Sequence, residues 1–326
     1  MKRAQIAALT LAANACFFAV NAWPQAFVPT RPVELLVHTG VGGGSDVFAK
    51  AVIEMAEKEK LLAQPFRVVN KTVGASAEAM AYLAGHKGDD HIIAVFTNTW
   101  IATPLTRKDA AHTVADFVPI ARLVLEPTIA VVSGKSPYRT LADVVAAAKK
   151  DPGKLRQAGG SLTAIESLTG LMIQSATGAK WSFVSTPAVA DRIGAVLAGK
   201  ADLIIPQPQD VNEHLASGAL RAVAAVTERR LAVLPAVSTV KEQGIDIPII
   251  ANTRGILGAP GMSQAAARYW EDWFARLVKT ASWRKYLEEN QVEDIFARGA
   301  ELEPYLKSQT VLMRRMLREA GVKVEG

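Results

Sequence analysis

Cysteine is almost absent from the chain, since the only one, Cys16, lies in the first apolar segment. Two positive residues precede the uncharged stretch 4–20, and small residues follow it, which predicts a signal peptide over residues 1–22 that is cut after Ala22. The mature protein is therefore expected in the periplasm, without a thiol, a disulfide or a cysteine-bound metal. The alternatives are a lipid-modified Cys16 or an N-terminal membrane anchor, although the stretch is shorter than the roughly 20 residues of a membrane span.

Runs of like charge are missing as well. The chain carries 37 Lys and Arg against 31 Asp and Glu, and no five like charges occur in succession. Loss of Lys2 and Arg3 with the signal lowers the formal net charge from +6 to +4. A nucleic-acid partner needs a concentrated basic face and is not expected, whereas a weakly cationic surface suits a small anionic ligand. No second apolar stretch of roughly 18 residues follows, so we expect a soluble mature protein.

The motifs of several enzyme classes are absent. The sequence has no Gly-x-Ser-x-Gly nucleophile turn and no His-Glu-x-x-His zinc helix. Its five histidines lack the spacing of metal ligands, and a lone histidine such as His38 is expected to be packed or solvated. We therefore expect no catalytic residue, no metal and no cofactor.

Short apolar strands alternate with helical segments from residue 33 onward. In the first part of the chain, strands are expected at 33–37, 66–69 and 91–96, and helices at 46–60 and 77–85. This alternation predicts an α/β fold in which mainly parallel sheets are flanked by helices on both faces. A mature chain of about 300 residues exceeds what one core usually holds, so two lobes are expected.

A second series of strands and helices follows residue 125. Strands are expected at 129–132, 155–158, 183–184, 201–205 and 220–226, and helices at 140–149, 164–174 and 189–198. Another strand begins near 253, Ser263 caps a long helix, and an amphipathic helix over 301–320 packs on the first lobe. We predict lobe 1 over 27–125 and 252–326, lobe 2 over 126–251, and a ligand held in the cleft between them.

A glycine-rich turn joins the first strand to the first helix. It reads Gly40-Val41-Gly42-Gly43-Gly44-Ser45-Asp46. A strand that ends in such a turn just before a helix points several backbone N–H groups at one place, which predicts an anion site. The alternative is a tight turn that needs positive φ and binds nothing. Loops at the carboxyl ends of neighbouring parallel strands are expected at the same edge.

This strand and turn resemble the signature loop of the Bug/TctC family, the periplasmic solute receptors of tripartite tricarboxylate transporters. Stretches similar to other family motifs follow in the family's order: Asn70-Lys71 with Gly74, Asp116 to Ala121, Gly199 to Asp202, His214 to Arg221, Leu234 to Thr239, and Glu242-Gln243-Gly244. The resemblance covers nearly all of the mature chain. It implies a two-lobe periplasmic binding protein of type II (Venus flytrap), expected to be a monomer, that binds a small organic acid and passes it to the transporter's membrane permease.

The sequence also departs from the family pattern. His38-Thr39 stands where the family usually has Pro-Phe, and Thr72-Val73 precedes Gly74 where a proline is usual. Arg254 stands where an aromatic residue is frequent. We expect these changes to alter the ligand rather than the fold.

The predicted ligand-binding residues share a place at the carboxyl end of a strand or the N-terminus of a helix. They are Val41, Gly42, Gly43, Gly44, Ser45, Asp46, Gly74, Ala75, Ser76, Thr97, Asn98, Ser161, Thr163, Gln207 and Arg254. For several of them a structural role is the alternative. Asp46, Ser161 and Thr163 would also serve as helix caps. Arg254 could grip a carboxylate or bridge the lobes, and Gln207 could touch the ligand or the hinge.

Two rival functions use the same features. A dinucleotide-dependent enzyme also has a glycine turn after its first strand, but the acidic residue expected at the end of its second strand is Asn70 here. A periplasmic sensor or carrier for signalling would use the same cleft and stays an alternative to transport. The sequence thus favours a receptor over an enzyme.

Overall fold

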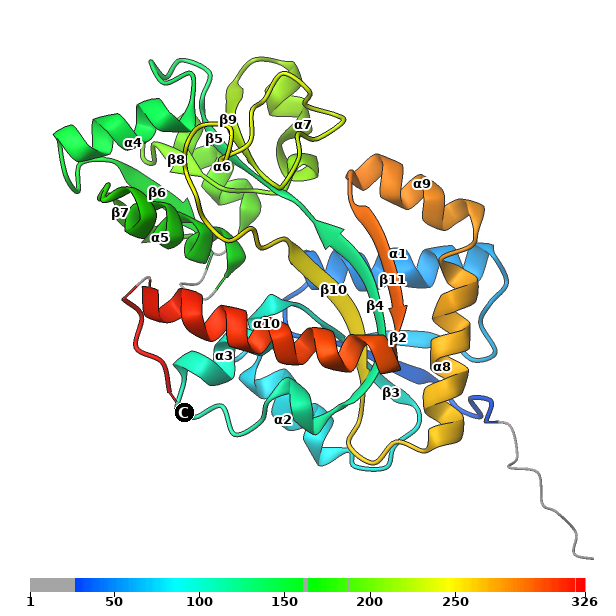
Figure 1. The fold of residues 1–326 in the computed structure, drawn as a ribbon. Helices are drawn as coiled ribbons and strands as arrows, with labels where there is room; N and C mark the ends of the chain where they lie inside the picture. Colours follow the sequence, from blue (N-terminus) through cyan, green and yellow to red (C-terminus); the bar gives the residue numbers. More distant parts are fainter. Residues whose placement is uncertain (1–26, 161–163, 187, 320, 326) are drawn as a thin grey trace, which may run out of the picture.

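The computed structural model describes residues 27–160, 164–186, 188–319 and 321–325. Within these residues the strands form two sheets, and helices flank both of them (Figure 1). The first sheet has the strand order β11-β4-β10-β3-β1-β2, and the second has the order β7-β6-β8-β5-β9. The predicted signal peptide lies outside the described residues.

The first sheet is parallel on one side and antiparallel on the other. Its strands are β1 (Val33–Val37), β2 (Phe66–Asn70), β3 (Ile92–Phe96), β4 (Val118–Glu126), β10 (Asn252–Gly258) and β11 (Glu293–Arg298). β1 pairs in parallel with β2 and β3, which are the strands that precede the predicted ligand loops. β10 runs antiparallel to β3 and β4, and β11 runs antiparallel to β4.

The second sheet repeats this mixture. Its strands are β5 (Thr128–Ser133), β6 (Arg156–Gly159), β7 (Ser182–Ser185), β8 (Leu203–Ile204) and β9 (Leu220–Val226). β6 is parallel to β7 and β8, whereas β5 is antiparallel to β8 and β9. The α/β prediction is confirmed, but the expectation of mainly parallel pairing holds for only part of each sheet. The chain leaves the first sheet through β4 and returns through β10, so these two neighbours run in opposite directions.

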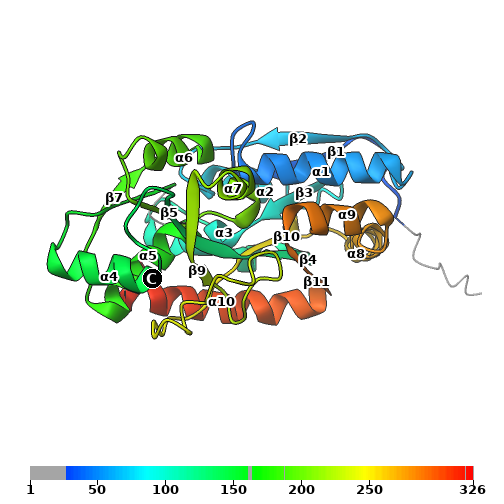
Figure 2. The same ribbon diagram turned by 90° about the horizontal axis from the view of Figure 1, so that it is seen from above.

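Two groups of helices cover the two faces of the first sheet. α1 (Gly44–Lys58), α8 (Gln264–Leu277) and α9 (Ala281–Asn290) share one core. α2 (Ala77–Gly85), α3 (Asn98–Thr106) and α10 (Gly299–Glu319) share the other. In the view from above, α1 and α10 lie on opposite sides of the sheet (Figure 2). Alternate residues of β3 enter the two cores, as the period of two in a strand requires.

The core of the α1 side contains most of the large aromatic side chains. Trp270, Trp273 and Trp283 are fully buried there, and Phe48 of α1 joins them. Val47 of α1 is 55% exposed. The buried stripe of α1 runs through Phe48, Val52 and Met55 at helical spacing, and Val47 lies outside it.

The second sheet is also covered on both faces. α4 (Leu141–Lys150) and α5 (Ile165–Thr177) contribute to one core, and α6 (Val189–Leu197) and α7 (Pro208–Ala216) contribute to the other. The predicted helices over 140–149, 164–174 and 189–198 are confirmed, whereas α7 was not predicted. Among the described helices, none has the length and apolar character needed to cross a membrane.

The two sheets are joined by closely spaced crossings. β4 continues through Pro127 directly into β5, and the returning chain enters β10 beside β4 (Figure 1). α10 packs on β4 and α3, as predicted for the C-terminal helix, and its far end reaches α5. The lobe limits, 27–125 with 252–326 and 126–251, remain a prediction. The chain passes from the first sheet to the second between Glu126, where β4 ends, and Thr128, where β5 begins.

Candidate ligand-binding site

The glycine turn between β1 and α1 ends in hydrogen-bond donors without acceptors. Gly42 has a φ of 78°, and the Gly43 N–H donates to the Gly40 carbonyl oxygen at 2.9 Å, which closes the turn. α1 then begins at Gly44, and Gly43 before it offers no side-chain cap. Within the described part of the chain, the N–H groups of Gly44 and Ser45 donate to no acceptor. Such donors at a helix N-terminus can bind an anion.

Asp46 holds this turn in shape. Its buried carboxylate accepts hydrogen bonds from Asn70 Nδ2 at 3.0 Å, Lys50 Nζ at 2.7 Å and the Gly42 N–H at 2.9 Å. Burial alone would raise the pKa of Asp46, but these three hydrogen bonds outweigh it and keep the pKa below its usual value. Asn70 also donates to the Thr39 carbonyl oxygen at 2.8 Å. Asp46 and Asn70 are therefore bound to the turn itself.

Close packing explains two of the glycines. A Cβ atom on Gly43 would lie 2.7 Å from Thr39 Cβ, and one on Gly44 would lie 2.9 Å from Arg254 Nη2. Both distances are shorter than a carbon or nitrogen contact allows. Val41 lies at the open tip of the turn and is 80% exposed. The turn is thus packed tightly on its inner side and open on its outer side.

The turn between β2 and α2 has a strained backbone. Gly74 and Ala75 both have positive φ, of 68° and 62°, and the left-handed region costs an alanine about 1–2 kcal/mol. In the described structure, the N–H groups of residues 74–76 donate to no acceptor. The Ser76 hydroxyl is buried and donates to the Thr99 carbonyl oxygen at 3.2 Å. This turn therefore offers backbone donors, whereas the Ser76 side chain fixes the turn to α3.

Thr97 and Asn98, at the end of β3, use their side chains within the protein. Thr97 Oγ1 caps α3 by accepting from the Thr99 N–H at 3.3 Å. Asn98 Oδ1 accepts from the Thr253 N–H at 2.9 Å, and Asn98 Nδ2 donates to the Ala251 carbonyl oxygen at 3.2 Å. Asn98 therefore fixes the returning chain where it enters β10.

Arg254 lies where the chain crosses between the sheets, and it is only 7% exposed. Asn252 of β10 lies opposite Glu126 of β4, so Arg254, two residues later on the same face, reaches the Glu126 carboxylate diagonally. Asn252 Nδ2 donates to the other Glu126 oxygen at 2.6 Å, and Arg254 Nη1 donates to Ser45 Oγ at 3.3 Å. Arg254 therefore connects β10, β4 and α1 around the first sheet, and its two expected roles, gripping a carboxylate or bridging the lobes, stay predictions.

In the second sheet, β6 is followed by Gly160 and later, in α5, by Glu166. Ser161 and Thr163 lie outside the described residues. The Gly160 N–H donates to Glu166 Oε1 at 3.0 Å, and the same carboxylate pairs with Arg192 at 2.9 Å. The N–H group of Gly160 therefore already has an acceptor, which is the Glu166 carboxylate.

Gln207 and Asp210 lie at the start of α7. Gln207 is the N-cap residue, and its N–H donates to Asp210 Oδ2 at 3.3 Å. Burial and the negative charge of Glu126 raise the pKa of Asp210 to about 6, although Arg192 and Arg254 oppose this shift. Sequence reasoning missed Glu126 and Asp210, because nothing local marks either as facing Arg254.

His38 is packed in the protein, which is one of the two environments that the sequence predicted for it. It follows β1 directly, is 9% exposed, and accepts a hydrogen bond at Nδ1 from Trp100 Nε1 at 3.1 Å. Burial, helped by the positive charge of Arg254, lowers the pKa of His38 to about 3. His38 lies between a buried parallel strand and a glycine turn, the region where ligands bind in α/β sheets.

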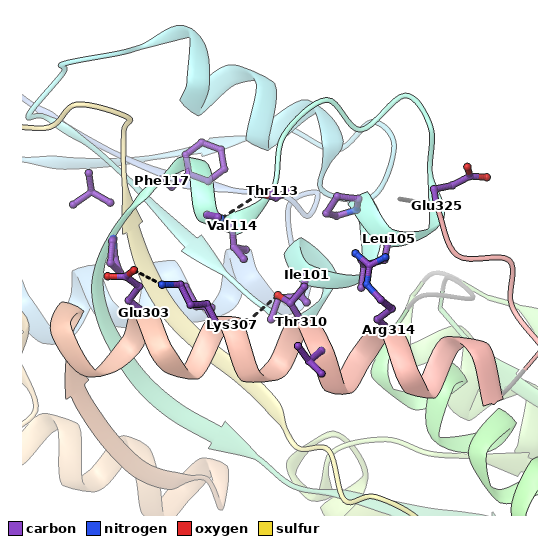
Figure 3. A pocket seen from close by; sticks show the side chains of 16 residues that line it. Ile101, Leu105, Thr113, Val114, Phe117, Glu303, Lys307, Thr310, Arg314 and Glu325 are labelled. Atoms are coloured by element: carbon purple, nitrogen blue, oxygen red, sulfur yellow. Dashed lines mark hydrogen bonds and ion pairs between the residues drawn. The ribbon is translucent and has the colours of Figure 1, made fainter.

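Two cavities lie apart from these loops. One of about 710 Å³ lies between α3, the short helix η1 (Val114–Asp116) and α10, with Phe117, Lys307 and Arg314 in its walls (Figure 3). The other, of about 770 Å³, lies beside the crossing and is lined in part by Pro127 and Ala251. Neither is lined by a residue of the glycine turn. Across the described residues, no three His, Cys, Asp or Glu side chains are placed to hold a metal.

A family model described as the tripartite tricarboxylate transporter family receptor, TctC, matches residues 49–322. The chain belongs to this family. This TctC-family chain is 26% identical over 295 residues to a UPF0065 protein in the gbd 5′ region of Cupriavidus necator. The match covers 90% of this chain and 88% of the relative. The family predicted from the loop motifs is therefore confirmed.

Two solved structures have the same fold. The first, R. palustris Rpa4515 with adipate, has a TM-score of 0.83 and 20% identity, over 90% of this chain and 99% of that one. The second, MatC (Rpa3494) from Rhodopseudomonas palustris with bound malate, has a TM-score of 0.78 and 19% identity, over 89% of this chain and 100% of that one. The predicted two-lobe fold of periplasmic binding proteins is confirmed for this TctC receptor.

Proposed function

We propose that this TctC-family protein is an exported receptor that binds a small carboxylate between its lobes and delivers it to the permease of a tripartite tricarboxylate transporter. The observation that carries the proposal is the pair of unpaired N–H groups at Gly44 and Ser45, where α1 begins. Backbone donors hold an anion without the strength of a full ion pair, so a receptor built on them can release its ligand. The family, and the adipate and malate named for two relatives of the same fold, support a carboxylate as the ligand.

The proposed site has a donor wall on the first sheet and a second wall across the cleft. Residues 41–45 and 74–76 supply the first wall, mainly through backbone N–H groups. Asp46, Thr97, Asn98 and Arg254 hold those turns and the crossing in place. Ser161, Thr163 and Gln207 remain the proposed contacts of the second wall.

A receptor binds its ligand and leaves it unchanged. We propose that this protein likewise leaves its ligand unchanged. We also propose that its signal peptide is cleaved, that it is located in the periplasm and that it is a monomer. The side chains that surround the glycine turn are engaged with the protein: Asp46 and Asn70 hold the turn, and Arg254 pairs with Glu126. These contacts support a role for the three side chains in positioning the backbone N–H donors of the turn.

A thermal-shift series tests the proposal. The mature protein is unfolded and refolded to strip any retained acid, and its melting temperature is measured with malate, succinate, adipate, citrate and NADH. A ligand that binds only the native state stabilises it, by roughly 2.7 kcal/mol at a ligand concentration of a hundred times Kd. The melting temperature therefore rises with ligand concentration. We expect at least one acid to raise the midpoint and NADH to leave it unchanged. A shift with NADH and with none of the acids would contradict the receptor function.

A further inference from the structure

His38 presents a hydrogen-bond donor whose direction is fixed by its neighbour. The residue lies between the end of β1 and the glycine turn, at the edge where Gly44 and Ser45 offer their N–H groups. Its ring is 9% exposed, so the protein holds most of it in place. Such a ring can act at the site only through an atom that is still open to solvent.

Trp100 decides which nitrogen that atom is. The indole N–H can donate but cannot accept, so the hydrogen bond of 3.1 Å requires an unprotonated Nδ1 on His38. Burial keeps the imidazole neutral at physiological pH, so its single proton lies on Nε2. Trp100 is itself completely buried and packs edge-on against Phe117, which leaves the indole little freedom to turn.

The Nε2–H of His38 is unpaired and accessible. It has no acceptor within the described residues, and it is not among their buried unpartnered polar atoms, so it keeps contact with solvent. This nitrogen is therefore a neutral donor on the residue that joins β1 to the glycine turn. A neutral N–H group can donate to an oxygen atom of a ligand. Because it is uncharged, it also places no second positive charge near the buried Arg254, which would be costly.

We propose that His38 Nε2–H donates to an oxygen of the bound acid and helps to select the ligand, with Trp100 as the positioning residue that fixes the tautomer. This inference rests on the proposed function and adds one specific contact to it. The acceptor is a carboxylate or hydroxyl oxygen of the ligand, and comparison of malate with succinate separates these two sources because only malate carries the hydroxyl.

Titration calorimetry on three variants tests the contact. His38→Phe keeps an aromatic ring but removes the donor, so we expect affinity for the bound acid to fall about tenfold to a hundredfold. If the hydroxyl is the acceptor, this loss appears for malate and not for succinate. Trp100→Phe keeps the ring packing and frees the tautomer, so a smaller loss is expected. His86→Phe, at the far end of α2, is the matched control and should bind as the wild type does.

A measurement on the unmutated protein does not depend on how the variants fold. In ¹⁵N-histidine NMR spectra, His38 should show an unprotonated Nδ1 and a protonated Nε2, and the Nε2–H proton should shift when malate or adipate is added. A protonated Nδ1, or an Nε2–H signal that the bound acid leaves unmoved, would overturn the inference while binding itself still supports the receptor. Absence of binding by every acid would instead defeat the proposed function, and this contact with it.

Discussion

Arg254 and Glu126 are 128 positions apart in the chain and form a buried ion pair where it crosses between the two sheets. Glu126 is the last residue of β4, and Arg254 lies near the start of β10. Their side chains are only 3% and 8% exposed. Because Arg254 also donates to Ser45, one guanidinium connects both crossing strands to the first turn of α1. The position of the proposed anion site therefore depends on the crossing.

Removal of the Glu126 charge should destabilise the protein strongly. Glu126→Gln leaves the Arg254 guanidinium buried without a counter-charge, and breaking a buried pair in this way costs about 3–5 kcal/mol. Urea unfolding at neutral pH measures the loss. Glu303→Gln is the matched control, since its pair with Lys307 is 59% and 72% exposed and such surface pairs contribute at most about 1 kcal/mol. Equal, small losses in the two variants would show that the buried pair does not stabilise the crossing.

Gly43→Ala should weaken ligand binding much more than it weakens the fold. The new methyl group would lie 2.7 Å from Thr39 Cβ, so the turn must shift and move the N–H groups of Gly44 and Ser45. Each hydrogen bond to a charged acceptor contributes about 1.5–3 kcal/mol, so the loss of one weakens binding at least tenfold. Calorimetry with the bound acid checks this expectation.

Gly85→Ala provides the control for that variant. Gly85 ends α2, has no positive φ, and an added Cβ would meet nothing within 4 Å. Alanine is the better helix former by up to about 1 kcal/mol, so the control should be slightly more stable and bind normally. Normal binding by Gly43→Ala as well would place the ligand away from this turn.

Asp210 should make stability depend on pH. Its pKa is about 6 in the folded protein against an ordinary 3.8, so the folded state binds this proton more tightly than the unfolded state does. The contribution to stability is complete below about pH 4 and is lost as the pH rises through about 6.

The variant Asp210→Asn should remove this dependence, since an amide oxygen can still accept from the Gln207 N–H. We expect the variant to be more stable than the wild type by on the order of 1–3 kcal/mol at pH 7.5, with no such gain at pH 4. Urea unfolding of both proteins at the two pH values decides this. A stability difference that does not change with pH would show that the carboxyl group is not the cause.

Helix caps and buried strands could be predicted because residues close together in the sequence determine them. Ser263 caps its helix as expected, by accepting from the Ala266 N–H, and Thr140 caps α4 in the same way by accepting from the Asp143 N–H. The buried strands β1 and β3 appear as short apolar runs. β11 carries Glu293 and Asp294, and an edge strand tolerates such charges, so no apolar run marks it.

Contacts between distant segments were not predictable in the same way. Arg254 meets Glu126 only through the register of β10 against β4, and the sequence does not show that register. β4 was itself not predicted. His38 and Trp100 belong to different strand–helix units, so their hydrogen bond depends on how β1 and α3 pack. The glycine turn was identified from sequence, but the side chains that shape it were not.

Titration calorimetry of the stripped wild-type protein with malate, succinate, adipate and citrate tests the central claim most directly. We predict that at least one acid binds at one site per chain and is recovered unchanged, that Gly43→Ala loses most of this affinity, and that Gly85→Ala retains it. Absence of binding by all four acids, or binding that Gly43→Ala leaves intact, would contradict a carboxylate site built on the N-terminus of α1.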